Sequence, residues 1–187
     1  MSRQRCEWCT SDPLYQHYHD HEWGRPVYDD QTLFELLILE GAQAGLNWLT
    51  ILKRREGYRA AFDHFNAEKI AHYGQEKIEA LMTDGNIVRN RRKIMSAINN
   101  ARAFLQVIEE FDSFCEFIWR FVNYQPRLNH WQFQTEVPAV SPESETMSKE
   151  MKRRNFSFVG PTICYAYMQA SGMVNDHTQH CFLYHDN

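Results

Sequence analysis

Cysteine and histidine residues gather at the two ends of the sequence. Near the C-terminus, "VNDHTQHC" places His177 and Cys181 four residues apart, a spacing that predicts both side chains on one side of a helical turn. The N-terminal segment "CEWCTSDPLYQHYHDHEWG" contains five more candidates, namely Cys6, Cys9, His17, His19 and His21. A structural zinc ion takes four Cys and His ligands, so we expect a Cys2His2 site that joins the two ends. Spacing alone chooses neither between the two cysteines nor among the three histidines.

A second group combines aromatic side chains with one carboxylate. Its aromatic members are Trp8, Tyr15, Tyr18, Trp23 and Trp48. Glu40 ends the apolar run "LFELLILE" and is followed by Gly41, Ala42, Ala44 and Gly45. Small residues allow a flat molecule to approach the backbone, and aromatic faces bind planar and cationic rings. The set predicts a pocket for a flat, electron-poor ring. In the alternative interpretation, the aromatics are core residues and Glu40 lies on the surface at a helix end.

Other catalytic patterns are absent from the sequence. It contains no G-x-S-x-G, P-loop, G-x-G-x-x-G or H-E-x-x-H motif. Cys164 lies inside the apolar stretch "TICYAYM" and is expected to be buried. The aromatic and carboxylate group is therefore the candidate site for chemistry.

Helical periodicity covers most of the chain and indicates the all-α class. Helices are expected in "DDQTLFELLILEGAQAG", "LNWLTILKRREGYRAAF", "EKIEALMTDGNIV" (ending at Asp84-Gly85), "RRKIMSAINNARAFLQVIEEF" and "SFCEFIWRFV". The fourth is the clearest, since Ile94, Ile98, Ala101, Leu105 and Ile108 are spaced by three and four residues. Residues from about 123 to 140 are expected to be irregular, with few strands.

The last third of the chain predicts a helical hairpin. Ser141-Pro142 begins the first helix, "NFSFVG" forms the turn, and Pro161 begins a second helix that ends before Gly172. Such a hairpin exposes backbone N–H groups at the start of its second helix, where a DNA phosphate could bind. An ordinary αα-hairpin is the alternative.

Charge and composition limit the class of protein. The formal net charge of −4 argues against general nucleic-acid binding, but basic residues cluster at 53–55, 89–93 and 152–154. Local clusters bind phosphate even on an acidic protein, although each could equally be a solvated helix end. The 187 residues, 43% hydrophobic, predict one domain spanning 1–187. No apolar run reaches membrane-spanning length and "MSRQRCEW" is too polar for a signal peptide, so we expect a cytoplasmic protein whose five cysteines form no disulfide framework.

Long stretches of the sequence resemble the 3-methyladenine DNA glycosylase I family, bacterial base-excision enzymes of the helix-hairpin-helix superfamily. The resemblance rests on "DPLYQHYHDHEWG", "LFELLILEGAQAGLNWLTILKRREGYRAAF", "FVGPTICYAYMQASGMVNDH" and the closing His/Cys pair. These stretches occur in the family's order from Cys6 to about Cys181. The resemblance implies a helical glycosylase-like domain with a DNA-facing hairpin and one structural zinc ion that joins the N- and C-terminal segments.

The resemblance also assigns residues by position. The implied zinc ligands are Cys6, His19, His177 and Cys181. The implied base pocket consists of Trp8, Tyr18, Trp23, Glu40 and Trp48, with Glu40 as the catalytic residue that accepts hydrogen bonds from the base. The implied DNA contacts are Gln43, Gly45 and Leu46, which fill the gap in the duplex, and Phe158, Val159, Gly160 and Thr162 of the hairpin.

The implied reaction needs little chemical assistance. A base alkylated at N3 is a cation with a weakened glycosidic bond, and it departs neutral. The enzyme flips the nucleotide out of double-stranded DNA, holds the cation and admits water, releasing free 3-methyladenine and leaving an abasic site. Because no lysine nucleophile is evident, a monofunctional enzyme is expected. We also expect a monomer without membrane contact. Asp176, near the place of the superfamily's catalytic aspartate, neighbours His177 and is expected to orient it.

Two rival hypotheses come from other classes. A zinc-stapled helical module would bind DNA or modified bases without cleaving them. A zinc hydrolase would need an open coordination position, which four protein ligands close. Glu40 among small residues favours the enzyme over the module.

Overall fold

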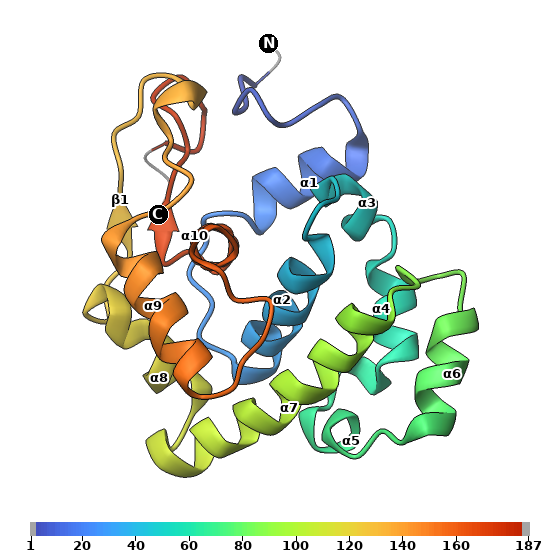
Figure 1. The fold of residues 1–187 in the computed structure, drawn as a ribbon. Helices are drawn as coiled ribbons and strands as arrows, with labels where there is room; N and C mark the ends of the chain where they lie inside the picture. The colour runs from blue at the N-terminus through green and yellow to red at the C-terminus, as the bar shows by residue number, and fades with distance from the viewer. Residues whose placement is uncertain (1–2, 185–187) are drawn as a thin grey trace.

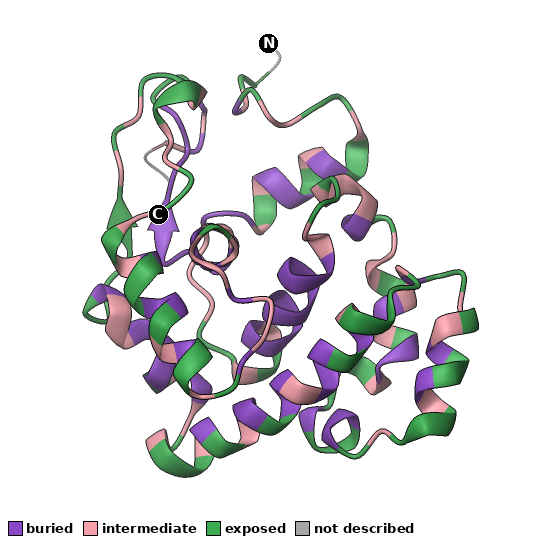
Figure 2. Ribbon diagram, in the orientation of Figure 1, coloured by how far each residue is buried: buried purple, intermediate pink, exposed green. Residues whose placement is uncertain are grey.

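Helix α2, from Asp30 to Gln43, lies at the centre of the fold (Figure 1). In the computed structural model, which describes residues 3–184, every residue from Leu33 to Ala42 is buried. Such a helix is apolar on nearly all sides and needs neighbours all around it. Figure 2 shows the buried residues running along α2 and along the inward faces of the helices that surround it. The polar residue Glu40 therefore lies inside the protein, near the end of a central helix.

The described residues are predominantly helical, as expected. The other α-helices are α1 (Pro13–His21), α3 (Trp48–Leu52), α4 (Arg55–Ala61), α5 (Ala67–Ala71), α6 (Gln75–Thr83), α7 (Arg91–Phe111), α8 (Phe114–Trp119), α9 (Pro142–Arg153) and α10 (Pro161–Ala170). Short 3₁₀ turns are η1 (Asp63–Phe65), η2 (Arg120–Val122) and η3 (Gln134–Glu136). The strands β1 (Arg127–Leu128) and β2 (Val174–Asn175) form one parallel pair.

Helix α7 matches its predicted bounds. The side chain of Asn90 caps it by accepting a hydrogen bond from the amide of Lys93, and the chain leaves the helix through Asp112 at a φ of 66°. Ile94, Ile98 and Ala101 are buried as the periodicity indicated. The helix packs against α2, α5, α6 and α8, so it connects both sides of the molecule (Figure 1).

The single helix expected over residues 46–62 is wrong. The chain forms α3 and α4 instead, because Arg54 leaves helical geometry with a φ of −106° and a ψ of 1°. This bend directs Arg55 toward Glu22 and Glu35, and its guanidinium forms ion pairs with both carboxylates. Tertiary ion pairing thus overrides a continuous helical pattern.

A helix in the N-terminal segment was not predicted. The side chain of Asp12 accepts a hydrogen bond from the amide of Leu14, and Pro13 occupies the first turn of α1. This pairing of an acidic cap with proline is a common helix start, so the signal was present in "SDP".

The helical hairpin of α9 and α10 forms where it was predicted. Ser141 caps α9, Pro142 and Pro161 lie in the first turns of α9 and α10, and Gly172 follows α10 with a φ of 69°. A Cβ at Gly172 would lie 2.1 Å from the carbonyl carbon of Arg25, so only glycine fits there.

The described ends of the chain lie near each other (Figure 1). The 123–140 segment is largely irregular, as predicted, and it pairs through β1 with β2 in the C-terminal segment. Among the described residues, no helix is long and apolar enough to cross a membrane.

Candidate active site and metal site

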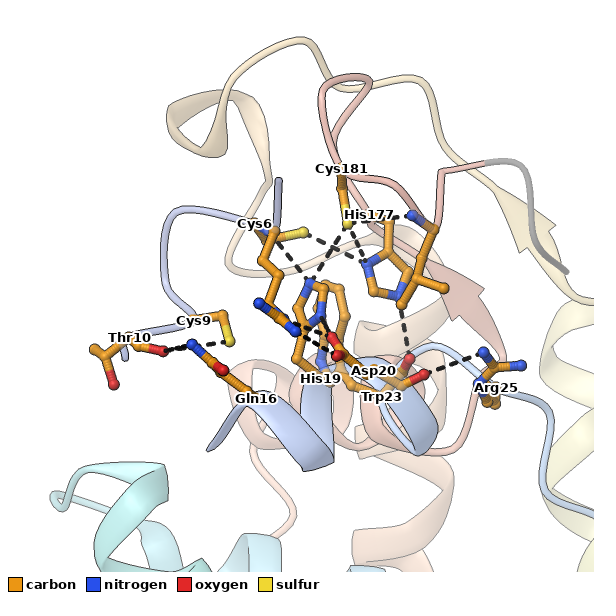
Figure 3. Close-up of polar contacts among 12 residues, drawn as sticks. Cys6, Cys9, Thr10, Gln16, His19, Asp20, Trp23, Arg25, His177 and Cys181 are labelled. Carbon is orange, nitrogen blue, oxygen red and sulfur yellow. Dashed lines mark hydrogen bonds and ion pairs between the residues drawn. The ribbon is translucent and has the colours of Figure 1, made fainter. Parts of the chain in front are cut away.

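A cluster of cysteine and histidine residues joins the two ends of the chain (Figure 3). Its members Cys6, His19, His177 and Cys181 are buried, and their potential ligand atoms all lie within 4.8 Å of one another. Cys181 Sγ lies 3.4 Å from His177 Nδ1 and 3.5 Å from His19 Nε2. A tetrahedral ion at ~2.3 Å from sulfur and ~2.0 Å from nitrogen gives sulfur–nitrogen separations of about 3.5 Å. The four residues could therefore hold a metal ion.

Hydrogen bonds set the ring orientation of both histidines. His19 Nδ1 lies 2.8 Å from Asp20 Oδ1, and His177 Nε2 lies 3.2 Å from the carbonyl oxygen of Trp23. Each acceptor holds the ring proton on that nitrogen, so the lone pairs of His19 Nε2 and His177 Nδ1 face the two sulfur atoms. The donor set thus has the tautomers that metal binding requires.

Arg5 extends this arrangement outward. Its guanidinium donates two hydrogen bonds to Asp20, at 2.8 and 2.7 Å, and lowers the pKa of that carboxyl to about 2. Asp20 therefore stays ionised and holds His19 in place over a wide pH range. Arg5 thus supports His19 through Asp20. Figure 3 shows Asp20 beside the His19 ring.

Replacing Asp20 with asparagine is expected to weaken metal affinity by about 10- to 100-fold, because an amide holds the His19 ring less firmly than a carboxylate does. Competition with a chromophoric chelator measures this affinity. Asp12→Asn is the matched control. Asp12 lies in the same N-terminal segment as Asp20, but it pairs with Lys53 and lies outside the cluster. Equal affinity in the two variants would show that Asp20 has no orienting role.

The structure distinguishes among the candidate ligands that spacing left open. Cys9 Sγ contacts the carbonyl oxygen of Thr10, and His17, His21 and His180 are exposed, so none of these joins the cluster. The helical turn expected at 177–181 is wrong. The segment follows β2 as an irregular turn, in which the amide of Cys181 donates to the carbonyl oxygen of Thr178.

An aromatic cavity of about 230 Å³ lies next to the cluster. Its lining residues are Trp8, Tyr15, Tyr18, Trp23, Glu40, Gln43, Trp48, Gln134, Ala166 and Gln169. They come from the N-terminal segment, α1, α2, α3, η3 and α10. Pockets for drug-sized ligands have roughly 300–1,000 Å³, so this one suits a single flat ring system. All five residues of the predicted base pocket are brought together here.

Glu40 is the carboxylate of this cavity. It is buried at 4% exposure, and it makes no hydrogen bond or ion pair with any described residue. Burial away from water raises its pKa to about 8, so the carboxyl is largely protonated at neutral pH. An unpaired buried acid costs stability, and such groups concentrate at functional sites.

The metal cluster and the cavity share a wall. The ring of Trp23 lies edge-on to the His177 imidazole, with centroids 4.7 Å apart, and Trp8 packs against both Trp23 and His19. Away from the cluster, the ring centroids of the cavity residues Tyr18 and Trp48 lie 5.6 Å apart. A metal ion at the cluster would therefore fix the aromatic walls without entering the cavity.

Three lining residues, Gln134, Ala166 and Gln169, carried no local signal in the sequence. Tyr15 belonged to the aromatic group that predicted a pocket, but the resemblance did not place it in the base pocket. Gln134 reaches the cavity from the irregular 123–140 segment. Its Oε1 atom is buried without a hydrogen-bond partner in the described part of the chain, and so are Nε1 of Trp8 and Nε1 of Trp48. These polar atoms could form hydrogen bonds with a polar ring in the cavity.

Asp176 is fully buried and lies outside the cavity lining. Its carboxylate accepts four side-chain hydrogen bonds, from Asn129, Trp131, Tyr165 and Gln169. It therefore anchors the 123–140 segment and the cavity-lining Gln169 to the chain beside His177. A carboxylate with all its acceptor positions occupied organises the site and is not available to activate water.

The predicted DNA-contact residues form two separate segments. After α2, the loop 43–46 turns at Gly45 (φ 77°) and exposes Leu46, while Gln43 also lines the cavity. In the hairpin, α10 begins at Pro161, and its N-cap residue Gly160 provides no side-chain cap, so the amides that follow Pro161 in the first turn remain available. The side chain of Val159 is buried in the core, so only the backbone of this predicted contact residue could face DNA.

Most of the clustered basic residues already have partners. Arg55 pairs with Glu22 and Glu35, Arg154 pairs with Glu110 and Glu150, and Arg91 pairs with Glu79. Among the described residues of these clusters, Arg89, Arg92 and Lys152 are exposed and make no ion pair. The clusters are mainly neutralised helix ends, with few cations left for phosphate.

The fold and this cavity place the chain among the helical DNA glycosylases. A crystal structure of 3-methyladenine DNA glycosylase I (TAG) matches it with a TM-score of 0.94 and 47% identity, covering 96% of this chain and 98% of that one. The structure that describes 3-methyladenine recognition by the enzyme from Staphylococcus aureus matches with a TM-score of 0.93 and 37% identity, covering 97% of both chains.

The sequence comparisons narrow this class to one family. The family model of methyladenine glycosylases matches residues 8–184, and DNA-3-methyladenine glycosylase 1 of Escherichia coli (strain K12) is 48% identical over 184 residues, 98% of each chain. The chain belongs to the methyladenine glycosylase family. The resemblance noted in the sequence is confirmed.

Proposed function

We propose that this chain is a monofunctional DNA glycosylase that removes 3-methyladenine from alkylated double-stranded DNA and leaves an abasic site. The observation that carries the proposal is Glu40, a buried carboxyl at the wall of an aromatic cavity that makes no hydrogen bond or ion pair with residues 3–184. The family and the names of its similar members support the same activity.

The cavity suits the chemistry of an N3-alkylated base. Aromatic faces attract a cationic ring, and the Glu40 carboxyl can give up its proton to become the matching anion. Water forms a bond to the sugar C1′ atom and loses a proton to the solvent, and the base departs neutral with the electron pair of the glycosidic bond. The described lining contains no lysine, so the cavity offers no amine for a covalent intermediate. Damaged bases also cost less to flip out of the stack, which adds selectivity.

A single structural zinc ion is the proposed occupant of the Cys6, His19, His177 and Cys181 cluster. The buried Cys2His2 donor set and its sulfur–nitrogen distances support this assignment. When bound, the ion supplies a rigid crosslink between the chain ends. Its four protein ligands leave no position for a reacting water molecule.

Two segments are proposed to contact DNA as parts of one monomeric domain. Leu46, at 40% exposure, would fill the gap left by the flipped nucleotide, with Gln43 and Gly45 beside it. Phe158, Val159, Gly160 and Thr162 of the hairpin would bind the phosphate backbone through their amides and, at Thr162, a hydroxyl group.

Chromatography of the bases released from methylated duplex DNA by the purified protein tests the proposal. We expect selective release of free 3-methyladenine, with 7-methylguanine left in the DNA. Folded, metal-loaded protein that binds methylated DNA but releases no base would instead indicate a binding module, with Glu40 as a recognition residue.

A further inference from the structure

Helix α7 carries a polar stripe on a face that is otherwise packed. Lys93, Ser96 and Asn100 are spaced by three and four residues, so they lie on one face of the helix. Ser96 and Asn100 are only 8% and 2% exposed. Burying polar groups in a helix interface costs stability unless each group is bonded, so their partners define what the stripe does.

At one end of the stripe, Lys93 holds the end of α2. Its ammonium group donates to the carbonyl oxygen of Ala42 at 2.8 Å and to that of Ala44 at 2.7 Å. These carbonyls lie where α2 ends and the loop 43–46 begins, so a cation there satisfies free acceptors and the helix dipole together. Lys93 thus fixes the point from which Leu46 projects.

At the other end, Asn100 and Ser96 hold the turn of the hairpin. Asn100 bonds the backbone of Ser157 in both directions, accepting from its amide at 2.8 Å and donating to its carbonyl oxygen at 2.9 Å. The hydroxyl groups of Ser157 and Ser96 lie 2.8 Å apart. The flanking residues Asn155 and Phe158 have φ angles of 66° and 54°, a backbone region that non-glycine residues adopt only when surrounding contacts enforce it.

The end of α2 also approaches the hairpin. A Cβ at Gly41, near the end of α2, would lie 3.4 Å from the Cβ of Phe158 in the hairpin. Figure 1 shows α7 running alongside α2, and the hydrogen bonds of Ser96 and Asn100 to Ser157 hold the connection between α9 and α10 against the same helix. One rigid helix therefore bonds both segments that were assigned to DNA.

We propose that Lys93, Ser96 and Asn100 form a positioning stripe that sets the separation between the loop 43–46 and the hairpin 155–160, so that both meet one duplex together. The inference rests on the proposed function. A protein that presents both contacts already in place loses less conformational freedom on binding than one that must order them. The stripe residues act through the two segments and need not touch DNA themselves.

Variants at the two ends of the stripe test the proposal. Lys93→Met and Asn100→Leu keep the side-chain size but remove the hydrogen bonds. Each is expected to weaken binding to duplex DNA with an abasic-site analogue about tenfold, while the Kd for free 3-methyladenine changes less than about twofold. Fluorescence anisotropy measures the first quantity and tryptophan fluorescence the second. Lys77→Met on α6 removes one charge elsewhere and is the matched control.

Two further readouts separate positioning from other roles. The slope of log Kd against log salt concentration should stay the same in Lys93→Met, whereas loss of a phosphate contact would reduce it by about one. The double variant should lose less than the product of the single losses, because either change already frees the two segments from each other.

Several outcomes would overturn the proposal. These are unchanged DNA binding in both single variants, equal losses of DNA and base binding, a reduced salt slope in Lys93→Met, or full additivity in the double variant. Wild-type protein that binds neither abasic DNA nor 3-methyladenine would overturn the proposed function, and the stripe with it. Wild-type binding with unaffected variants would overturn the stripe alone.

Discussion

Cys181→Ser is expected to lose stoichiometric zinc and to lower the free energy of unfolding by roughly 4 kcal/mol or more. The reason is that metal-binding energy at a structural site is also folding energy. The cluster joins Cys6 to His177, 171 positions away, so the bound ion closes nearly the whole chain into one loop. Serine keeps the volume of the side chain but is a poor zinc ligand. Elemental analysis gives the metal content, and urea unfolding gives the stability.

Cys9→Ser is the control, because Cys9 lies outside the cluster and its sulfur donates a hydrogen bond to the carbonyl oxygen of Thr10. It should keep both metal and stability. A chelator should lower the Tm of the wild-type protein and of Cys9→Ser, and leave that of Cys181→Ser unchanged. Full zinc retention in Cys181→Ser would contradict the ligand assignment.

Local patterns predicted the parts of the fold that local interactions decide. Helix α7 and the α9–α10 hairpin appeared at their expected positions because caps, prolines and apolar spacing all lie within each segment. The break between α3 and α4 could not be found in this way. It depends on Arg55 reaching Glu22 and Glu35, which are distant in sequence.

The candidate site shows the same division. Trp8, Tyr18, Trp23, Glu40 and Trp48 were grouped because they lie close in sequence or carry unusual neighbours. Gln134 and Gln169 come from segments distant in sequence from the aromatic group, and Asp176 binds both segments through Asn129 and Gln169. No local pattern encodes that arrangement. Likewise, spacing could not choose Cys6 over Cys9. The resemblance assigned Cys6, and the folded chain places Cys6, and not Cys9, beside His177.

The second large effect is expected at Glu40. Glu40→Gln should keep the fold and the metal, yet reduce the single-turnover rate of 3-methyladenine release roughly 100-fold or more, the scale seen when one electrostatic contact to a transition state is removed. The amide matches the carboxyl in shape but cannot become an anion opposite the cationic base. Quenched-flow chromatography of released base measures the rate. Unchanged turnover would remove Glu40 from its proposed role.

Glu40→Gln should lower the rate of base release but raise the free energy of unfolding. Burial raises the pKa of Glu40 from 4.5 to about 8, so the folded protein binds this proton more tightly than the unfolded chain does. The stability that this bound proton contributes is therefore fully present below pH 4.5. It is lost as the pH rises toward 8, a change on the order of 5 kcal/mol. Glutamine has no proton to lose.

Relative to wild type, Glu40→Gln should accordingly become more stable from pH 5 upward, with the largest difference above pH 8, as urea unfolding at pH 5, 7 and 9 would show. Glu76→Gln, an exposed acid in the first turn of α6, should follow the wild-type curve. A structural carboxyl would lose stability and activity together when replaced. A gain in stability with a loss of base release would identify Glu40 as a group kept at a cost to the fold because the chemistry requires it.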